Sequence, residues 1–271
     1  MVRIKKIISL SPTKSDFGPL LFSGNLDLGL QMAAELGYDG VEISLRDSDE
    51  LDFGWLQERL SALKLRVYGI ATGQTYYNDG FSLFAADADH RKRAVQRMKD
   101  HINLAAKLGA MVIVGGIRGK IDVKSDYAVE YAKGKEAIRE IAQAGQAMGV
   151  TLLIEMINRY ETNVFNTLDQ AMELIADLGF ANLKVLADTF HMNLEETSLT
   201  DSFRKAGKNL GYVHFADSNR LAPGWGHLDL PAIFEILKAI DFNGPVGIEV
   251  LPKPGDLEAA RQGIEFLNKL F

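Results

Sequence analysis

The sequence predicts a single α/β domain, residues 1–271, that folds as a closed (β/α)8 barrel. Two observations predict this fold. Short runs rich in Val, Ile and Leu alternate with longer amphipathic segments in eight even units. The chain of 271 residues also matches the roughly 250 residues that such a barrel takes. An open, doubly wound sheet of the same elements is the alternative, and the evenness of the eight units favours the barrel.

The apolar runs predict eight strands. They are continuously apolar rather than alternating, as expected for parallel strands that are buried on both faces. The predicted strands lie near residues 5–11, 40–45, 66–72, 111–116, 150–156, 183–188, 211–216 and 245–251.

The segments between these runs predict helices with one apolar face. Glycines follow four of them, at the position where a left-handed closing residue is favoured: Gly37, Gly109, Gly149 and Gly179. The predicted helices cover residues 26–36, 54–63, 90–108, 126–148, 167–178, 199–209, 229–240 and 256–270.

Composition excludes several classes of protein. The chain has no cysteine, which rules out disulfides, thiolate metal sites and cysteine nucleophiles. Its formal net charge of -6 argues against a nucleic-acid partner, because phosphate binding needs concentrated Lys and Arg. No run approaches the roughly 18 apolar residues of a membrane span, and the first residues are typical of a strand rather than a signal peptide. We therefore expect a cytoplasmic protein with no membrane partner.

Polar residues interrupt four consecutive predicted strands near their carboxyl ends: Glu155, Asp188, His214 and Glu249. In a barrel these strand ends converge on one face, where active sites lie. Three carboxylates and one imidazole would repel one another unless a cation lay between them. This donor set suits Mn²⁺ or Mg²⁺, with Co²⁺ or Zn²⁺ as further options. Taken singly, each residue could instead pair with a lysine, cap a helix or lie satisfied in the core.

Several motifs resemble the sugar isomerase and epimerase TIM barrels of the xylose isomerase type, and they are most similar to D-tagatose 3-epimerase-like ketose epimerases. They are GVTLLIEMINRYETNVFNT (149–167), VLADTFHMNLEE (185–196), YVHFADSNRLAPGWGHLD (212–229) and GPVGIEVL (244–251). The opening half is similar too, in 37–47 and 70–80, so the resemblance spans nearly the whole chain. The resemblance implies that the metal ligands are the four residues named above. It also implies a small keto-sugar substrate and a homo-oligomer, a dimer or tetramer.

The resemblance further implies the chemistry of the site. Glu161, His191 and Arg220 would hold the substrate's oxygens next to the metal. The metal would stabilise an enediolate formed by removing the proton beside the carbonyl. Glu155 and Glu249 would act on opposite faces of that intermediate, one removing the proton and the other returning one.

Two further arginines bear on the choice of substrate. Arg46 follows the second predicted strand and Arg118 follows the fourth, so with Arg220 up to three guanidinium groups would lie at the mouth of the barrel. A guanidinium matches a carboxylate or phosphate. We therefore expect a ketohexose of the tagatose or allulose type, or its sugar-acid relative such as tagaturonate or 5-ketogluconate. The acid is favoured, as in the 5-keto-L-gluconate epimerase branch. The alternative is that Arg46 and Arg118 form salt bridges on the rim, for example with Asp47 or Asp122.

Other functions remain open on the same barrel. An aldose–ketose isomerase or an inosose dehydratase-type lyase would use the same metal logic, whereas a non-catalytic sugar-binding module would have little need for opposed carboxylates. An apurinic-site endonuclease is disfavoured by the negative charge and by the presence of only five histidines.

Several residues carry weaker expectations. The loop at residues 73–77 could form an aromatic lid over the substrate or simply pack. Trp225 and His227 are expected to shape a loop, and His90 and His101 are expected to be solvated on a charged helix.

Overall fold

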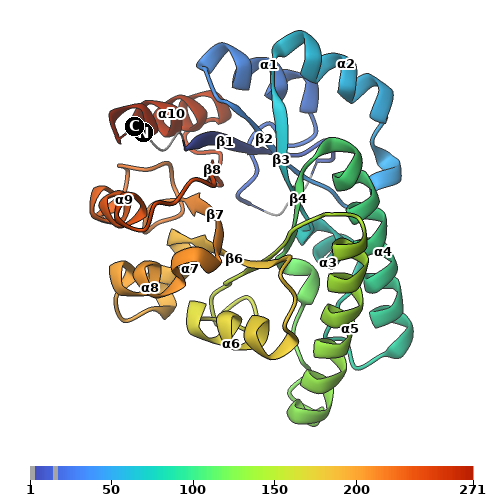
Figure 1. Ribbon diagram of the computed structural model, residues 1–271. Helices are drawn as coiled ribbons and strands as arrows, with labels where there is room; N and C mark the ends of the chain where they lie inside the picture. The colour runs from blue at the N-terminus through green and yellow to red at the C-terminus, as the bar shows by residue number, and fades with distance from the viewer. Residues whose placement is uncertain (1–3, 15–17, 271) are drawn as a thin grey trace.

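A computed structural model, which describes residues 4–14 and 18–270, shows a closed barrel of eight parallel strands. Each strand pairs with the next along the chain, and β1 pairs with β8 to close the ring. In Figure 1 the strands occupy the centre and the helices surround them. The predicted barrel is confirmed, and the open-sheet alternative is wrong.

All eight predicted strands are present, and most are slightly shorter than predicted. Their bounds are β1 (Lys5–Leu10), β2 (Gly40–Ser44), β3 (Arg66–Ala71), β4 (Met111–Val114), β5 (Leu152–Glu155), β6 (Leu183–Asp188), β7 (Leu210–Phe215) and β8 (Pro245–Ile248).

The predicted helices are also present, and two short ones, α3 and α7, were not predicted as separate elements. The helices are α1 (Leu26–Leu36), α2 (Phe53–Leu63), α3 (Gly73–Asp79), α4 (Ala88–Leu108), α5 (Tyr127–Ala147), α6 (Leu168–Leu178), α7 (Thr189–Glu195), α8 (Leu199–Ala206), α9 (Leu230–Ala239) and α10 (Asp256–Leu270).

The helix ends follow local chemistry. Gly37, Gly109 and Gly179 close α1, α4 and α6 with φ values of 86°, 66° and 73°, the left-handed conformation that costs glycine little. Gly149 has a φ of 68° but lies one residue past Met148, which closes α5. At the helix starts, polar side chains accept hydrogen bonds from first-turn N–H groups. These capping residues include Asn25, Asp52, Asp87, Asp126, Thr167, Ser198 and Asp229.

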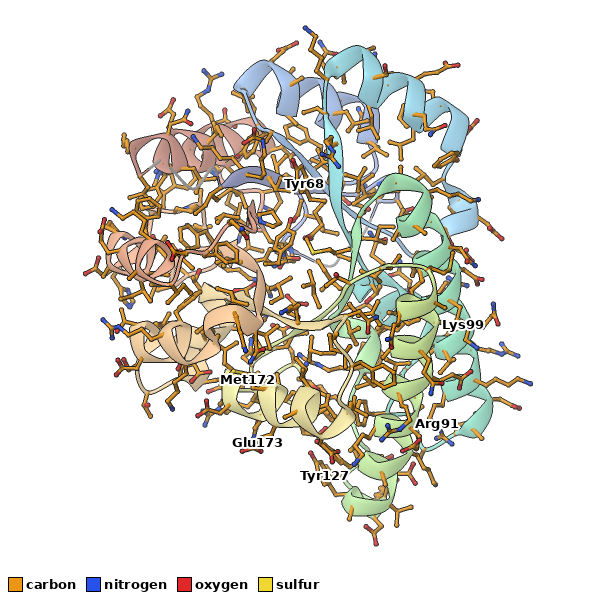
Figure 2. The ribbon with its side chains drawn as sticks, in the orientation of Figure 1. Tyr68, Arg91, Lys99, Tyr127, Met172 and Glu173 are labelled. Carbon is orange, nitrogen blue, oxygen red and sulfur yellow. The ribbon has the colours of Figure 1, made fainter. Side chains whose placement is uncertain are left out.

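The core has two parts. Apolar side chains fill the space between the strands and the surrounding helices (Figure 2). A separate buried cluster lies on the strands' other face, inside the barrel: Ile7, Ala71, Ile113, Leu153, Leu186 and Tyr212. Because strand side chains alternate, the residues two positions after Leu153, Leu186 and Tyr212 face the same interior. Those residues are Glu155, Asp188 and His214.

His101 differs from the sequence-based expectation. It lies on α4 but is fully buried, so the prediction of a solvated side chain is wrong. Neither ring nitrogen has a hydrogen-bond partner among the described residues. Burial lowers the pKa of His101 to about 3, which keeps the ring neutral. His90, on the same helix, is exposed as expected.

Within residues 4–14 and 18–270, no helix has both the length and the apolar character needed to cross a bilayer.

Candidate functional site

Four polar side chains meet at one end of the barrel. Glu155, Asp188 and His214 lie at or next to the carboxyl ends of β5, β6 and β7, and Glu249 lies one residue beyond β8. All four are buried, and one ligand atom from each lies within 4.8 Å of the others. The structure therefore brings together the four residues that the sequence singled out, at the face where barrels of this type place their active sites.

The two ring nitrogens of His214 face different surroundings. Nδ1 lies 3.6 Å from Glu155 Oε1 and 3.7 Å from both Asp188 Oδ2 and Glu249 Oε2. Nε2 lies 2.9 Å from Oε2 of Glu42, on β2. Within the part of the chain that the structure describes, neither Nδ1 of His214 nor Oδ2 of Asp188 has a hydrogen-bond partner. Buried polar atoms are normally satisfied, so a group that is aimed at these two atoms would complete the site.

The carboxyl groups of this cluster lie close enough to shift one another's pKa values. Burial raises the pKa of Glu249 well above its ordinary value, although His214 opposes the shift. The pKa of Asp188 is lowered despite burial, because His191, His214 and Arg220 favour its charged form. A compact group of carboxylates whose pKa values move apart in this way is typical of a site that receives a positive charge.

A pocket opens beside the cluster, and the three residues expected to hold substrate, Glu161, His191 and Arg220, line it. Its lining comprises Ser44, Ala71, Thr72, Gly73, Tyr77, Gly116, Glu155, Ile157, Glu161, His191, Arg220 and Glu249. Arg220 connects the groups: its Nη1 lies 3.2 Å from Glu161 Oε1, and its Nη2 lies 3.7 Å from Glu249 Oε2. Arg220 has a φ of 61°, an uncommon value outside glycine, which marks a backbone held by its surroundings.

Asn158 is a pocket residue that the sequence reasoning missed. Its side-chain Nδ2 donates to Glu161 Oε1 at 3.0 Å and lies 2.7 Å from His191 Nδ1. Its backbone N–H also donates to His191 Nδ1, at 3.3 Å. The side chain is nearly fully buried. Asn158 therefore fixes both Glu161 and His191, and its place in the NRYE segment was the available signal.

The structure separates the two additional arginines. Arg46 is 43% exposed at its side chain and pairs with Asp79, Nε to Oδ1 at 2.7 Å, and with Glu50 at 3.6 Å. Arg46 does not line the pocket, so the alternative of a salt bridge on the rim applies to it. The suggested partner Asp47 pairs with Arg97 instead.

Arg118 differs from Arg46 in burial and in pairing, although it does not line the pocket either. It is fully buried, and its three guanidinium nitrogens have no hydrogen-bond acceptor in residues 4–14 and 18–270. Its Cζ lies 5.8 Å from the centre of the Phe165 ring. Burial lowers the pKa of Arg118 to about 10, against the opposing charges of Glu155, Tyr77 and Glu161. No salt bridge links it to Asp122 among the described residues.

The segment 73–77 forms the short helix α3 rather than an irregular loop. Gln74 is buried and donates to Ser11 Oγ at 2.6 Å, whereas Tyr77 lines the pocket and donates to Glu161 Oε2 at 3.3 Å. Gly116 allows the close approach of this helix, since a Cβ there would lie 2.9 Å from Gly73 Cα. Most of this segment therefore packs against neighbouring residues, and the side chain of Tyr77 reaches the pocket.

The loop after β7 is shaped as expected. His227 Nδ1 lies 2.9 Å from Ser218 Oγ, and the carbonyl of Trp225 accepts a hydrogen bond from Asn219. The Asp217 carboxylate accepts hydrogen bonds from three backbone N–H groups of this loop, those of Ser218, Gly224 and Leu228. The loop carries Arg220, so these contacts hold the arginine over the pocket.

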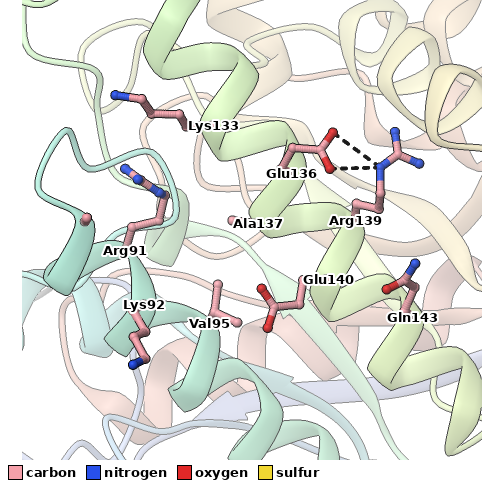
Figure 3. Close-up of a pocket in the computed structure, with 10 residues that line it drawn as sticks. Arg91, Lys92, Val95, Lys133, Glu136, Ala137, Arg139, Glu140 and Gln143 are labelled. Carbon is pink, nitrogen blue, oxygen red and sulfur yellow. Dashed lines mark hydrogen bonds and ion pairs between the residues drawn. The ribbon is translucent and has the colours of Figure 1, made fainter.

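A second hollow lies between α4 and α5, away from the barrel mouth (Figure 3). Its volume is about 390 Å³, and its walls carry both acidic and basic side chains. Glu136 pairs with Arg139 at 3.2 Å, and Glu140 pairs with Lys99 at 2.7 Å. These charges are satisfied in solvent, so the groove shows no sign of a ligand.

Comparison with known proteins identifies similar proteins of one family. A family model described as xylose isomerase-like TIM barrel matches residues 30–270. The L-ribulose 3-epimerase of Mesorhizobium japonicum is 31% identical over 226 residues, which are 83% of this chain and 75% of that protein. The D-psicose 3-epimerase of Agrobacterium fabrum is 32% identical over 234 residues, 83% and 79% of the two chains. The crystal structure of a D-allulose 3-epimerase from Methylomonas sp. has a TM-score of 0.85 over 100% and 99% of the chains, and its 23% identity supports the fold alone.

Proposed function

The chain belongs to the xylose isomerase-like TIM barrel family, and from this premise we propose that it is a metal-dependent epimerase inverting C3 of a keto sugar. One observation carries the proposal. Two buried carboxylates, Glu155 and Glu249, meet an aspartate and a histidine at one point of a pocket that also holds Arg220. The named relatives above are all sugar 3-epimerases, which are isomerase-class enzymes.

The residues present fit a divalent cation. Glu155, Asp188, His214 and Glu249 would hold it, with Mn²⁺ preferred and Mg²⁺ or Co²⁺ as alternatives, because oxygen donors with one imidazole suit these ions. The unpartnered Nδ1 of His214 and Oδ2 of Asp188 support this assignment. When bound, the ion supplies Lewis acidity that makes the C–H beside the substrate's carbonyl more acidic.

Glu155 and Glu249 would move the proton. They come from the ends of β5 and β8, which are not neighbours in the ring, so the two carboxylates reach the pocket from different sides. One would remove the C3 proton to form the enediolate, and the other would return a proton to the opposite face. That division of work produces inversion rather than simple exchange.

His191 and Arg220 would stabilise the charge that develops on the substrate oxygen. The Asn158 backbone N–H donates into His191 Nδ1, so a neutral imidazole carries its hydrogen on Nε2. Burial lowers the pKa of His191, which favours that neutral form. Nε2 lies 3.3 Å from Nη2 of Arg220, in a contact whose donor depends on the tautomer of the ring, and both residues line the same pocket. A substrate oxygen between them would accept from both.

The substrate we favour is a keto-sugar acid of the tagaturonate or 5-ketogluconate type, rather than a neutral ketohexose of the tagatose or allulose type. Arg118 supports this choice, because a fully buried guanidinium without an acceptor is costly to the fold. A substrate carboxylate would give it a bidentate partner. Arg46 does not contribute, since it is already paired on the rim. A homo-oligomeric state and a cytoplasmic location stay predictions.

The test is a panel of keto sugars incubated in D₂O with the Mn²⁺-loaded enzyme and followed by NMR and mass spectrometry. We expect deuterium at C3, a new diastereomer and no loss of water, fastest with tagaturonate or 5-ketogluconate. Turnover of tagatose, allulose and fructose alone would overturn the preference for an acid. Conversion to an aldose would identify an isomerase, and loss of water a lyase. Absence of exchange with every sugar, despite bound metal, would make the reaction wrong.

A further inference from the structure

A fourth buried carboxylate, Glu42, lies inside the barrel and takes no part in the chemistry proposed above. It belongs to β2 and is fully buried. Its Oε2 lies 2.9 Å from His214 Nε2, and its Oε1 accepts a hydrogen bond from Ser9 Oγ at 2.9 Å. Both carboxylate oxygens are thus engaged in a place where an unpaired charge would be costly.

The barrel leaves room for this contact. Glu42 is paired in register with Gly69 on β3, where a Cβ would lie 3.3 Å from Glu42 Oε2. His214 is paired in register with Gly247 on β8, where a Cβ would lie 3.1 Å from the imidazole. Small residues on both flanking strands therefore leave space for a carboxylate and an imidazole to meet across the interior.

A bulge sets the direction of Glu42. The pairing of β2 with β3 passes from Val41–Val67 to Glu42–Gly69 and skips Tyr68, the residue labelled in Figure 2. Such irregularities re-aim side chains and are common next to active sites. Here the carboxylate points to the far side of His214 from the other three acids.

We propose that Glu42 is a positioning residue that sets which nitrogen of His214 is available as a ligand. This inference rests on the metal site of the proposed function. A carboxylate accepts but does not donate, so Glu42 fixes the imidazole hydrogen on Nε2 and leaves the Nδ1 lone pair free. Nδ1 is the nitrogen that faces Glu155, Asp188 and Glu249. Carboxylates that hold a metal-binding histidine in this way orient the ring and raise its basicity.

The test compares Glu42→Gln with Glu130→Gln. Glu130 is also a buried carboxylate, but it lies on α5 and pairs with Lys133 at 2.8 Å, away from the site. Metal-free protein is titrated with Mn²⁺ and Co²⁺ by calorimetry, and the Co²⁺ absorption spectrum is recorded. We expect Glu42→Gln to weaken metal affinity by about 10- to 100-fold and to alter the spectrum, with Glu130→Gln like the wild type. Equal affinities and spectra for Glu42→Gln and the wild type would overturn the inference.

A measurement on the unmodified chain keeps the inference testable if Glu42→Gln fails to fold. The ¹H–¹⁵N coupling pattern of ¹⁵N-histidine-labelled, Zn²⁺-loaded protein reports which ring nitrogen of His214 carries hydrogen. Hydrogen on Nε2 supports the inference, and hydrogen on Nδ1 overturns it. Wild type that binds metal but epimerises no sugar would refute the proposed function and leave this inference standing. Wild type that binds no metal would overturn both.

Discussion

The barrel-mouth pocket and the α4–α5 groove are both hollows lined by charged side chains, yet they differ in how those charges are satisfied. In the groove (Figure 3), Glu136 and Arg139 face solvent and pair with each other. Beside the pocket, Asp188 and His214 are buried with atoms that lack hydrogen-bond partners among the described residues, and the buried guanidinium of Arg118 has no acceptor among them either. The number of charges is therefore a poor guide to a site, and unsatisfied buried charge is a better one.

Free energy explains the difference. An exposed ion pair typically contributes about 0–1 kcal/mol, because water already solvates both partners. A buried charge without a partner costs several kcal/mol. Exposed ion pairs, as in the groove, therefore cost the fold little. Buried charges without partners, as at the site, are expected where a bound ligand offsets their cost. This contrast can be tested by matched substitutions in the two places.

The largest expected effect is the loss of an acid-base carboxylate. Glu249→Gln keeps the size of the side chain but removes its charge, so we expect kcat to fall by roughly 1,000-fold or more, as for the loss of general acid-base catalysis. Glu140→Gln, in the groove, is the matched control and should retain wild-type turnover. Epimerisation followed by chromatography measures both. Turnover of Glu249→Gln within a few-fold of the wild type would remove Glu249 from the mechanism.

Removal of metal should act next most strongly, and only through the pocket. Dialysis against a chelator is expected to abolish turnover, and added Mn²⁺ should restore it. Saturating metal should also stabilise the fold, by about 2.7 kcal/mol at 100 times the dissociation constant. Thermal unfolding of the wild type and of His214→Ala, with and without Mn²⁺, provides the measurement. An equal metal-induced rise in Tm for both proteins would place the ion elsewhere.

Arg118 gives a more selective effect. Arg118→Met should lower kcat/KM for a keto-sugar acid by about 10- to 100-fold, the value of hydrogen bonds to a charged group. Turnover of a neutral ketose should change little, and the fold should be no less stable, because a buried unpaired charge has been removed. Arg139→Met in the groove is the control. Equal losses on acidic and neutral sugars would contradict a role in recognising the carboxylate.

The sequence alone predicted the strands and the four residues of the metal cluster. Runs of apolar residues predicted every strand, and Glu155 and Glu249 stood out because carboxylates rarely interrupt such runs. Glu42 carries the same signal within GVEIS but lies in the middle of its strand, where a search of strand ends does not reach it. Its function depends on His214, 172 residues later in the chain.

Other features required the structure because they depend on distant partners. Arg46 and Arg118 both follow a strand, and only the folded chain shows that Asp79 satisfies the first while nothing satisfies the second. His101 lies among charged residues in sequence, and its burial follows from the face of α4 that it occupies. Local patterns thus predict elements, whereas pairing and burial are set by contacts between elements.

His101 limits this comparison, because it is buried without a hydrogen-bond partner among the described residues and yet lines neither the barrel-mouth pocket nor the groove. Burial is the main cause of its low pKa of about 3, with Arg97 adding to the shift and Asp47 opposing it. The folded pKa lies below the ordinary value of 6.5, so the unfolded chain binds more protons between these values. Stability should therefore be full above pH 6.5 and fall as the pH drops towards 3. The loss should reach a few kcal/mol, and His101→Leu should flatten it in urea unfolding from pH 7 to 4.

The smallest expected effect lies in the groove itself. Glu136→Gln breaks the exposed pair with Arg139, so we expect the free energy of unfolding to change by less than about 0.5 kcal/mol, and even less at high salt, which screens exposed charges. Metal affinity and turnover should stay at wild-type values. Urea unfolding at low and high ionic strength measures the change. A loss of several kcal/mol that persists in high salt would show that the groove, too, contains charge that the fold alone does not satisfy, and the distinction from the pocket would then fail.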